Sequence, residues 1–326
     1  MAGDSPIVNA AARLAAGDVV AFPTETVYGL GADATNPQAI ARVFALKGRP
    51  ADHPLIVHIA DPASLGEWAG EVPETARALA ARFWPGPLTL ILKRSARVPD
   101  AVTGAQDTVG VRCPSHPLAQ ELLREFTRVG SGAVAAPSAN KFGHVSPTTA
   151  EHVRDEFGPG LMVLDGGACE VGLESTIVDL SRGEAVLLRP GAVSRDAIAS
   201  LLGAAVRDRD AQAPRVPGAL AAHYAPRTAL VLVESAELAL EVATPANVAV
   251  LAMREPQGDI RVTSWITAPV DPVRYGHDLY ASLRTLDASG AKRIVVEAPP
   301  RLAAWEAVND RLARAAAGAS ALDDEP

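Results

Sequence analysis

The 326-residue sequence predicts an α/β fold in two domains, on three observations. Short apolar runs, long enough for buried strands, alternate with amphipathic segments along most of the chain. Hydrophobic residues make up 48% of the sequence, which is enough for two cores. Between residues 207 and 227 the alternation stops, and three prolines occur without a clean period. We therefore expect domains over residues 1–206 and 228–326, joined by a linker over 207–227.

The expected elements follow from apolar periodicity and from residues that start or stop helices. Asn36-Pro37 is an N-cap signal with proline in the first turn, and Gly48 is a C-cap signal, so they bound one helix. In order, the expected helices span residues 5–16, 37–47, 63–69, 74–83, 116–126, 149–157, 194–202, 272–287 and 301–317, and the expected strands span residues 19–22, 55–59, 88–92, 108–112, 133–136, 161–164, 175–180, 185–188, 230–233, 248–251, 260–265 and 293–297.

Two features of this pattern have a specific structural meaning. The first strand ends at Pro23, and we expect Gly29 and Gly31 to tighten the polar turn that follows, because glycine adopts positive φ without strain. After residue 228, strands and helices alternate again, which predicts a small parallel sheet with helices on its faces.

Composition narrows the class of protein. The net charge of -8 argues against a general polyanion binder, although a local basic groove is still compatible with it. Cys113 and Cys169 form no CxxC pair and indicate a reducing compartment. We expect no signal peptide, because the first residues lack a basic segment followed by an apolar one. No apolar run approaches about 20 residues, the length needed to span a membrane. A cytoplasmic protein is therefore expected, with no membrane partner.

Common catalytic signatures are missing from the sequence. It contains no phosphate-binding G-x-x-x-x-G-K-[ST] loop, no G-x-S-x-G elbow, no H-E-x-x-H and no paired Cys/His zinc spacing. Gly29-Leu30-Gly31 lacks the third glycine of a dinucleotide fingerprint. Cys113 is interpreted as a buried structural cysteine rather than a nucleophile.

Polar side chains instead gather in loops at strand ends. Arginine and lysine bind phosphate or carboxylate through charge-assisted hydrogen bonds, and hydroxyl groups complete such sites. Lys47 is one of only four lysines in an arginine-rich chain, which favours a point charge placed over a phosphate. The candidates are Thr24, Thr26, Tyr28, Lys47, Arg49, Thr108, Arg112, Ser138, Asn140, Ser146, Ser175, Thr176 and Arg189.

Each candidate taken alone also has a purely structural interpretation. Lys47 and Arg49 fit ordinary cations at a helix C-terminus, where the helix dipole favours positive charge. Arg112 and Arg189 fit surface residues at strand ends, and His58, with apolar neighbours, fits a core histidine. The combination and order of the motifs, rather than any single residue, carry the functional interpretation.

In this order, the motifs PTETVYGLG, K-x-R-P with HPLIVH, V-R-x-P, APSAN with SPT, STIVD and RPG resemble the YrdC-like catalytic domain of threonylcarbamoyl-AMP synthases over about residues 5–205. The linker sequence HYAP and the segments YASLRTLD and AVNDRL resemble the longer, two-domain form of this family. The resemblance implies an open, twisted YrdC-like α/β sheet domain followed by a smaller Rossmann-like α/β domain.

The resemblance implies an adenylyl-transferring enzyme. L-threonine, bicarbonate and ATP would give threonylcarbamoyl-AMP and pyrophosphate, with Mg²⁺ carried by ATP and no protein metal site. The implied downstream partner is the threonylcarbamoyltransferase complex that modifies tRNA, with tRNA or double-stranded RNA as a further partner. Such a transfer depends on positioning and charge neutralisation, which fits a chain without a catalytic triad.

Site residues carried over from the family fall into three groups. Lys47 and Arg49 would be catalytic, neutralising phosphate or carbamate charge. The threonine-binding residues would be Thr26, His58, Arg112, Ala136 and Ser175, with Arg112 holding the carboxylate, and the ATP-binding residues would be Arg49, His53, Thr108, Ser138, Ser146, Arg189 and Tyr224, with Tyr224 in the linker acting as a lid.

The sequence departs from the family at three places and leaves two rival functions open. His53 replaces the usual asparagine, Phe142 replaces the usual serine, and residues 219–222 lack the basic and aromatic run that often precedes HYAP. One rival is a carbamoyltransferase that adenylates a carbamoyl group, although the sequence lacks the accompanying acylphosphatase and zinc-finger signatures. The other is a double-stranded RNA-binding module, which the acidic net charge disfavours.

Overall fold

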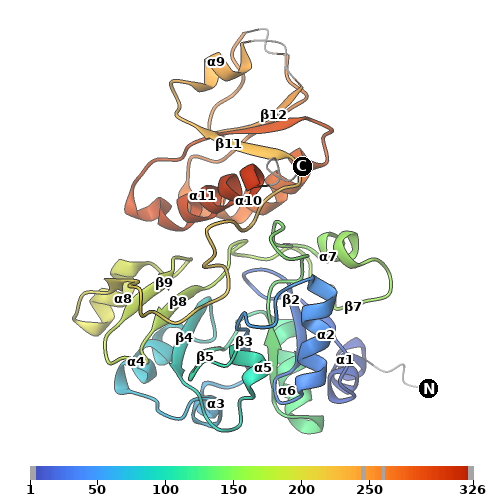
Figure 1. Cartoon of the computed structure of the whole chain (residues 1–326), viewed down its shortest axis with the longest axis vertical. Coiled ribbons are helices and arrows are strands. Elements are labelled where there is room, and N and C mark those ends of the chain that lie inside the picture. Colours follow the sequence, from blue (N-terminus) through green and yellow to red (C-terminus); the bar gives the residue numbers. More distant parts are fainter. Residues whose placement is uncertain (1–4, 244–246, 259–260, 322–326) are drawn as a thin grey trace. The chain divides into compact units, whose positions relative to one another are not determined.

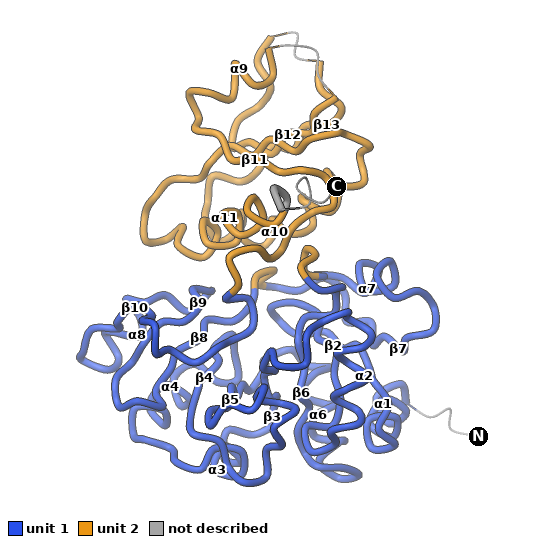
Figure 2. Tube along the Cα trace, in the orientation of Figure 1, with its two compact units in different colours: residues 1–142, 147–170, 174–219 blue, residues 143–146, 171–173, 220–326 orange. Residues whose placement is uncertain are grey.

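A computed structural model describes residues 5–243, 247–258 and 261–321, and Figure 1 shows the order of its elements. The chain divides into two compact units, coloured separately in Figure 2. Unit 1 comprises residues 1–142, 147–170 and 174–219, and unit 2 comprises residues 143–146, 171–173 and 220–326. The predicted α/β class is confirmed in both.

Unit 1 is built on a ten-stranded sheet in the order β10-β9-β8-β4-β5-β3-β6-β2-β1-β7. Parallel and antiparallel pairs are mixed: β3 runs parallel to β5 and antiparallel to β6. The strands are β1 (Val20–Phe22), β2 (Gly29–Asp33), β3 (Ile56–Ile59), β4 (Leu88–Lys93), β5 (Thr108–Arg112), β6 (Ala133–Ala136), β7 (Met162–Val163), β8 (Thr176–Asp179), β9 (Val186–Arg189) and β10 (Arg207–Asp208).

The helices of unit 1 begin and end largely where the sequence signals them. Asn36 accepts hydrogen bonds from the backbone N–H of Gln38 and Ala39, and Gly48 ends the same helix at φ +65°, so both predicted caps are confirmed. The helices are α1 (Pro6–Ala15), α2 (Pro37–Lys47), α3 (Leu65–Trp68), α4 (Glu74–Phe83), α5 (Asp100–Thr103), α6 (Pro117–Val129), α7 (Ala150–Phe157) and α8 (Arg195–Leu202), with a 3₁₀ turn at η1 (Pro62–Ser64).

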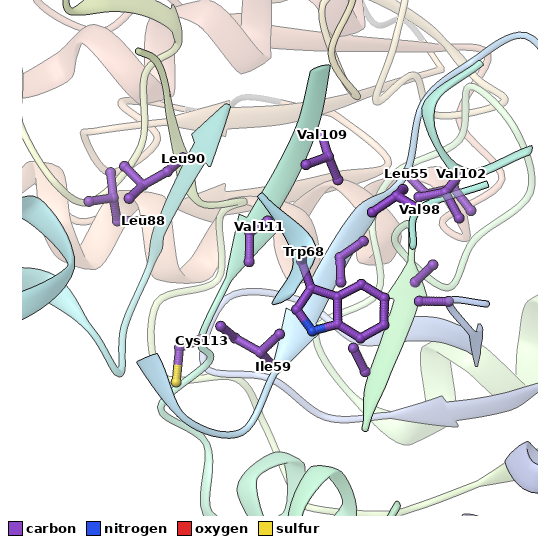
Figure 3. Close-up of a cluster of buried hydrophobic side chains, with 14 of the residues drawn as sticks. Leu55, Ile59, Trp68, Leu88, Leu90, Val98, Val102, Val109, Val111 and Cys113 are labelled. Atoms are coloured by element: carbon purple, nitrogen blue, oxygen red, sulfur yellow. The ribbon is translucent and has the colours of Figure 1, made fainter. Parts of the chain in front are cut away.

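One face of the unit 1 sheet carries the larger core. Side chains alternate between the two faces of a strand, so Leu88 and Leu90 of β4 and Val109 and Val111 of β5 point the same way (Figure 3). Trp68 of α3 packs into this cluster, together with apolar residues of α2, α4, α5 and α8. The core therefore fixes which strand residues remain for the opposite face.

The opposite face is covered in two parts. Helices α1 and α6 cover strands β1 and β6, where Val20, Phe22 and Val134 are buried. Over β3, β4, β8 and β9 the cover is the irregular segment 213–219, whose Val216 is buried against a cluster that includes Ile56 and Ile177. Part of the predicted linker thus packs as a layer of unit 1.

Gly29 and Gly31 are not turn residues, and that prediction is wrong. Both lie in β2 and neither has a positive φ. A Cβ atom on Gly31 would lie 2.6 Å from Cγ1 of Val134 and 2.8 Å from Cε1 of Phe22. The glycines are therefore required by close packing against the Phe22 ring rather than by backbone conformation.

Unit 2 is a four-stranded, all-parallel sheet in the order β11-β14-β12-β13, as the alternation after residue 228 predicts. Helices α10 and α11 lie on one side of this sheet and α9 on the other (Figure 1). The third strand lies at residues 264–267 instead of 260–265, and residues 259–260 are outside the described residues. The elements are β11 (Ala229–Val233), α9 (Leu238–Val242), β12 (Val248–Ala252), β13 (Ser264–Thr267), α10 (Pro272–Asp287), β14 (Arg293–Glu297), η2 (Ala303–Trp305) and α11 (Glu306–Ala321).

Candidate functional site

Buried polar side chains interrupt the apolar face of unit 1 that lies opposite the larger core. In β3, Val57 belongs to the larger core, so His58 points to the other face. The β3–β5 register pairs His58 with Arg112, which places an imidazole and a guanidinium side by side. Both residues are buried. Sequence reasoning had selected both, and the sheet brings them together.

Arg112 is held by three groups of the protein. Its Nη1 donates to Oγ1 of Thr26 at 2.9 Å, its Nε donates to the Gly86 carbonyl at 3.4 Å, and its Nη2 lies 2.7 Å from Oε1 of Glu25. The Arg112 side chain is 4% exposed and that of Glu25 is 2% exposed. This is a buried ion pair, and its carboxylate was not among the predicted site residues.

His58 is kept neutral by its surroundings. Burial and the adjacent positive charge of Arg112 lower the pKa of His58 from 6.5 to about 3. Its Nδ1 lies 3.1 Å from the Ile56 carbonyl, and its ring meets the edge of the Phe22 ring at 5.9 Å between centroids. At neutral pH His58 is therefore a hydrogen-bonding group without charge.

Ser175 and Arg189 form a second cluster. The hydroxyl of Ser175 lies 2.7 Å from that of Thr89 and accepts a hydrogen bond from Nη2 of Arg189 at 3.1 Å. Arg189 also donates from Nε to the Ser175 carbonyl and from Nη1 to the carbonyl of Pro217 in the segment 213–219. The structure thus joins a predicted threonine-binding residue directly to a predicted ATP-binding residue. Thr89 was missed, because a single threonine inside an apolar strand carries no sequence signal.

Lys47 lies at the end of α2 and points into the protein. Its Nζ donates to the carbonyls of Ser138 and Asn140 at 2.6 and 2.5 Å, so it fixes the loop that follows β6. Burial, and then the nearby charge of Arg49, hold the pKa of Lys47 well below its usual range. An anion that approaches Nζ would raise this pKa, because a nearby negative charge favours the protonated lysine.

Arg49 and His53 lie near Lys47 in the loop after α2. Arg49 is buried and donates from Nη2 to the Pro54 carbonyl at 2.9 Å. The His53 ring lies 5.4 Å from the Phe142 ring, centroid to centroid. Burial and the charge of Arg49 lower the pKa of His53 below its usual value. Two of the three departures from the family pattern, His53 and Phe142, are therefore neighbours.

Two other predicted residues lie in the same sheet. Thr108 begins β5 and is buried, on the same side of the strand as Arg112. Ala136 ends β6 and pairs with Ile56 of β3. Its side chain is buried and lies 3.4 Å from the position that a Cβ atom on Gly29 would occupy.

Ser146 and Tyr224 belong to unit 2. Ser146 is buried, and its carbonyl accepts a hydrogen bond from Arg284 of α10. Tyr224 has a φ of +62°, its ring lies 5.7 Å from the Tyr280 ring, and the guanidinium of Arg311 stacks over it at 5.3 Å. The lid role of Tyr224 stays a prediction, and within unit 2 the residue is a packed aromatic.

Both cysteines of unit 1 are buried. Burial raises the pKa of Cys113 to about 11 and that of Cys169 to about 12, so both stay as thiols at neutral pH. The described part of the chain contains no group of three or more His, Cys, Asp or Glu side chains that could hold a metal ion. Of the helices described, none is both long enough and apolar enough to cross a membrane.

The arrangement is suited to binding anions and polar groups rather than to nucleophilic attack by a side chain. Lys47, Arg49, Arg112 and Arg189 are all buried in unit 1. Their partners are mainly carbonyl and hydroxyl groups, and Glu25 is the carboxylate paired with one of them. Such fixed cations stabilise phosphate or carboxylate charge at low reorganisation cost.

Comparison with known proteins identifies the relatives of the chain. The family model Sua5_yciO_yrdC, described as "Telomere recombination", matches residues 12–191, and the model described as "Threonylcarbamoyl-AMP synthase, C-terminal domain" matches residues 193–317. Curated threonylcarbamoyl-AMP synthases of Pyrococcus abyssi and Bacillus subtilis are each 39% identical to it, over 94% and 97% of this chain and 92% and 94% of theirs. The crystal structure of P. abyssi Sua5 complexed with L-threonine matches with a TM-score of 0.87 and 37% identity, covering 96% of this chain and 94% of that one.

Proposed function

The chain belongs to the threonylcarbamoyl-AMP synthase family, and from this membership we propose how the buried cations and hydroxyls of unit 1 perform its reaction. The protein is an adenylyl-transferring enzyme that makes threonylcarbamoyl-AMP from L-threonine and ATP. We propose bicarbonate as the source of the carbamate carbon. The carbamate oxygen then attacks the α-phosphorus of ATP, and pyrophosphate leaves.

The observation that carries the proposed threonine site is the set of donors on Arg112. A guanidinium has five N–H donors, and three of the Arg112 donors face Gly86, Thr26 and Glu25. Two N–H groups therefore remain for the carboxylate of threonine, which an arginine binds in a fork geometry. Neutral His58 beside Arg112 supplies a polar contact without adding charge.

The remaining threonine contacts come from three neighbours in this part of the sheet. Thr26 is bonded to Arg112, and Ser175 offers a hydroxyl that Arg189 holds in place. Ala136 ends β6 and pairs with Ile56 of β3, two residues before His58. These contacts support a pocket for a small hydroxy amino acid.

The ATP side is proposed around Lys47 and Arg49. The depressed pKa of Lys47 would rise when phosphate or carbamate charge arrives, which stabilises the anionic transition state. His53, Thr108, Ser138, Ser146 and Arg189 are proposed as further ATP contacts, and Tyr224 as a lid. Mg²⁺ would enter on ATP and neutralise its phosphate charge.

Two partners are proposed downstream of the reaction. A mixed anhydride such as threonylcarbamoyl-AMP hydrolyses readily, so its consumer should be a threonylcarbamoyltransferase complex that modifies tRNA. We also propose tRNA as a direct contact, and cytoplasm as the compartment where these substrates meet.

Pyrophosphate release from ATP tests the proposal, with each amino acid added singly in the presence and absence of bicarbonate. Release that requires both threonine and bicarbonate is the expected result. Arg49→Ala should abolish release, whereas Arg128→Ala, which changes an exposed arginine paired with Glu125, should leave it unchanged. Release driven by carbamoyl phosphate would instead indicate the carbamoyltransferase class. No pyrophosphate release with any substrate would favour the RNA-binding function. That function would be measured as an affinity for double-stranded RNA that falls steeply with salt concentration.

A further inference from the structure

Glu25 is a buried carboxylate that the proposed threonine and ATP contacts leave without a function. It lies between Thr24 and Thr26, is 2% exposed, and is paired with Nη2 of Arg112. Its two oxygens have about four lone-pair positions between them. Among the described residues, neither oxygen has a hydrogen-bond partner of acceptable geometry, so the ion-pair contact leaves acceptor capacity unused.

The titratable groups around Glu25 come from two other elements and a loop. Arg112 and Cys113 lie at the end of β5, and Cys169 lies in the loop after β7. The charge of Glu25 contributes to the raised pKa of both thiols. His58 of β3 lies beyond Arg112 and is neutral. Both thiols are also neutral, so Arg112 is the charged group that faces Glu25 among the described residues.

A cation and an anion held side by side are complementary to an α-amino acid, which carries a carboxylate and an ammonium on neighbouring atoms. Burial of an unpaired ammonium is unfavourable, so a zwitterion that enters this region needs an anion as well as a cation. In the proposed complex the substrate carboxylate occupies the two remaining donors of Arg112. Its ammonium group then falls within reach of the neighbouring carboxylate.

We propose that Glu25 binds the ammonium group of the amino-acid substrate and removes its proton, which makes the amine nucleophilic. The inference rests on the proposed function and assigns Glu25 the role of general base. Carbamate formation needs a neutral amine, because an ammonium nitrogen has no free electron pair. A carboxylate is a suitable acceptor when it is held in a dry site next to the amine.

The step balances with bicarbonate as the co-reactant. The ammonium N–H bond breaks and its proton passes to Glu25, which leaves R–NH₂. Glu25 passes this proton to bicarbonate, whose C–OH bond breaks to give CO₂ and water. The nitrogen electron pair then forms the C–N bond with CO₂. A second proton passes from the nitrogen to Glu25 and is then lost to solvent. The products are the carbamate, one water and one proton.

The test compares Glu25→Gln and Glu25→Asp with the wild type in the full-length protein, as kcat/KM for threonine between pH 7 and pH 9.5. Glutamine keeps the size of the side chain but accepts no proton at these pH values. We expect Glu25→Gln to lose about 100-fold at pH 7, within the usual range for a general base. At pH values below the pKa of the free amine its remaining rate should rise about tenfold per pH unit, and above that pKa it should level off, because the amine must lose its proton in solution. Glu25→Asp should keep the wild-type profile at a lower rate.

A second substrate separates base catalysis from positioning. The amine of 4,4,4-trifluorothreonine is less basic than that of threonine, so at pH 7 the ratio of Glu25→Gln to wild-type rates should improve at least tenfold with this analogue. An equal loss for both substrates with an unchanged pH profile would show that Glu25 only orients Arg112, and the proposal would be overturned. Unchanged kinetics in Glu25→Gln would overturn it as well. A wild-type protein without threonine-dependent pyrophosphate release would instead refute the proposed function itself.

Discussion

Removing Arg112 should destabilise unit 1 as well as stop catalysis. The change Arg112→Met leaves the carboxylate of Glu25, 2% exposed, without the cation that lies 2.7 Å away. Breaking a buried pair by removing one partner costs about 3–5 kcal/mol, because a charge stays behind in a poorly solvated place. The hydrogen bonds to Thr26 and Gly86 are lost in the same variant.

A double variant isolates the origin of this cost. In Arg112→Met with Glu25→Gln the stranded charge is gone, so all but about 1–3 kcal/mol of the loss should be recovered, the remainder being the cost of unsatisfied polar groups. The exposed pair of Arg128 and Glu125 is the matched control, and Arg128→Met should cost about 0–1 kcal/mol.

The assay is unfolding in urea, monitored by hydrogen exchange of peptides that contain β4 and β5. These peptides report on the stability of unit 1 alone. The double variant should be more stable than Arg112→Met and equally inactive in pyrophosphate release. If Arg112→Met is as stable as Arg128→Met, then Glu25 is not held as a charged group by Arg112. In that case the ion pair, and the role built on it, would have to be abandoned.

Three further changes test other parts of the site. The pKa of His58 is about 3 in the folded protein and 6.5 in the unfolded chain, so between pH 6.5 and pH 3 only the unfolded chain binds this proton. Between pH 7 and pH 5 the wild type should therefore lose about 2 kcal/mol of stability. His58→Gln should not show this loss, and urea unfolding midpoints at the two pH values measure the difference. Gly31→Ala should cost about 1–3 kcal/mol by overpacking and lower the melting temperature, while Gly66→Ala, with nothing within 4 Å, should not. Ser175→Ala removes the hydroxyl that accepts a hydrogen bond from Arg189. It should raise the KM for threonine and leave the Ki of a non-hydrolysable ATP analogue nearly unchanged. A normal threonine KM would exclude Ser175 from the pocket.

The elements of the fold were largely predictable from local sequence. Periodicity and caps located α2 and α4 and the limits of β5 and β14. These signals come from residues that are close to one another in the sequence, within one helix or one strand. Gly29 and Gly31 were misassigned because their role depends on the ring of Phe22, a contact made only after β1 and β2 pair. Periodicity sees neighbours along the chain and not neighbours across a sheet.

The same limit applies to the site. Arg112, Ser175 and Arg189 were predicted, because cations and hydroxyls at strand ends form a recognisable pattern together with the family motifs. Glu25 was assigned no role because the identity of its partner depends on how the turn after β1 packs onto the C-terminal end of β5. Its significance is a property of a pair whose members are 87 residues apart in the sequence.

The irregular segment 213–219 sets where the first unit can be separated from the rest of the chain. A recombinant fragment ending at residue 206 would expose the apolar surface that includes Ile56 and Ile177, and it would lack the Pro217 carbonyl that anchors Arg189. Exposed β-branched side chains of this kind promote aggregation of a fragment that is otherwise folded. A fragment extended through Ala219 would keep that surface covered and would be the better starting point for NMR or crystallisation of the isolated unit.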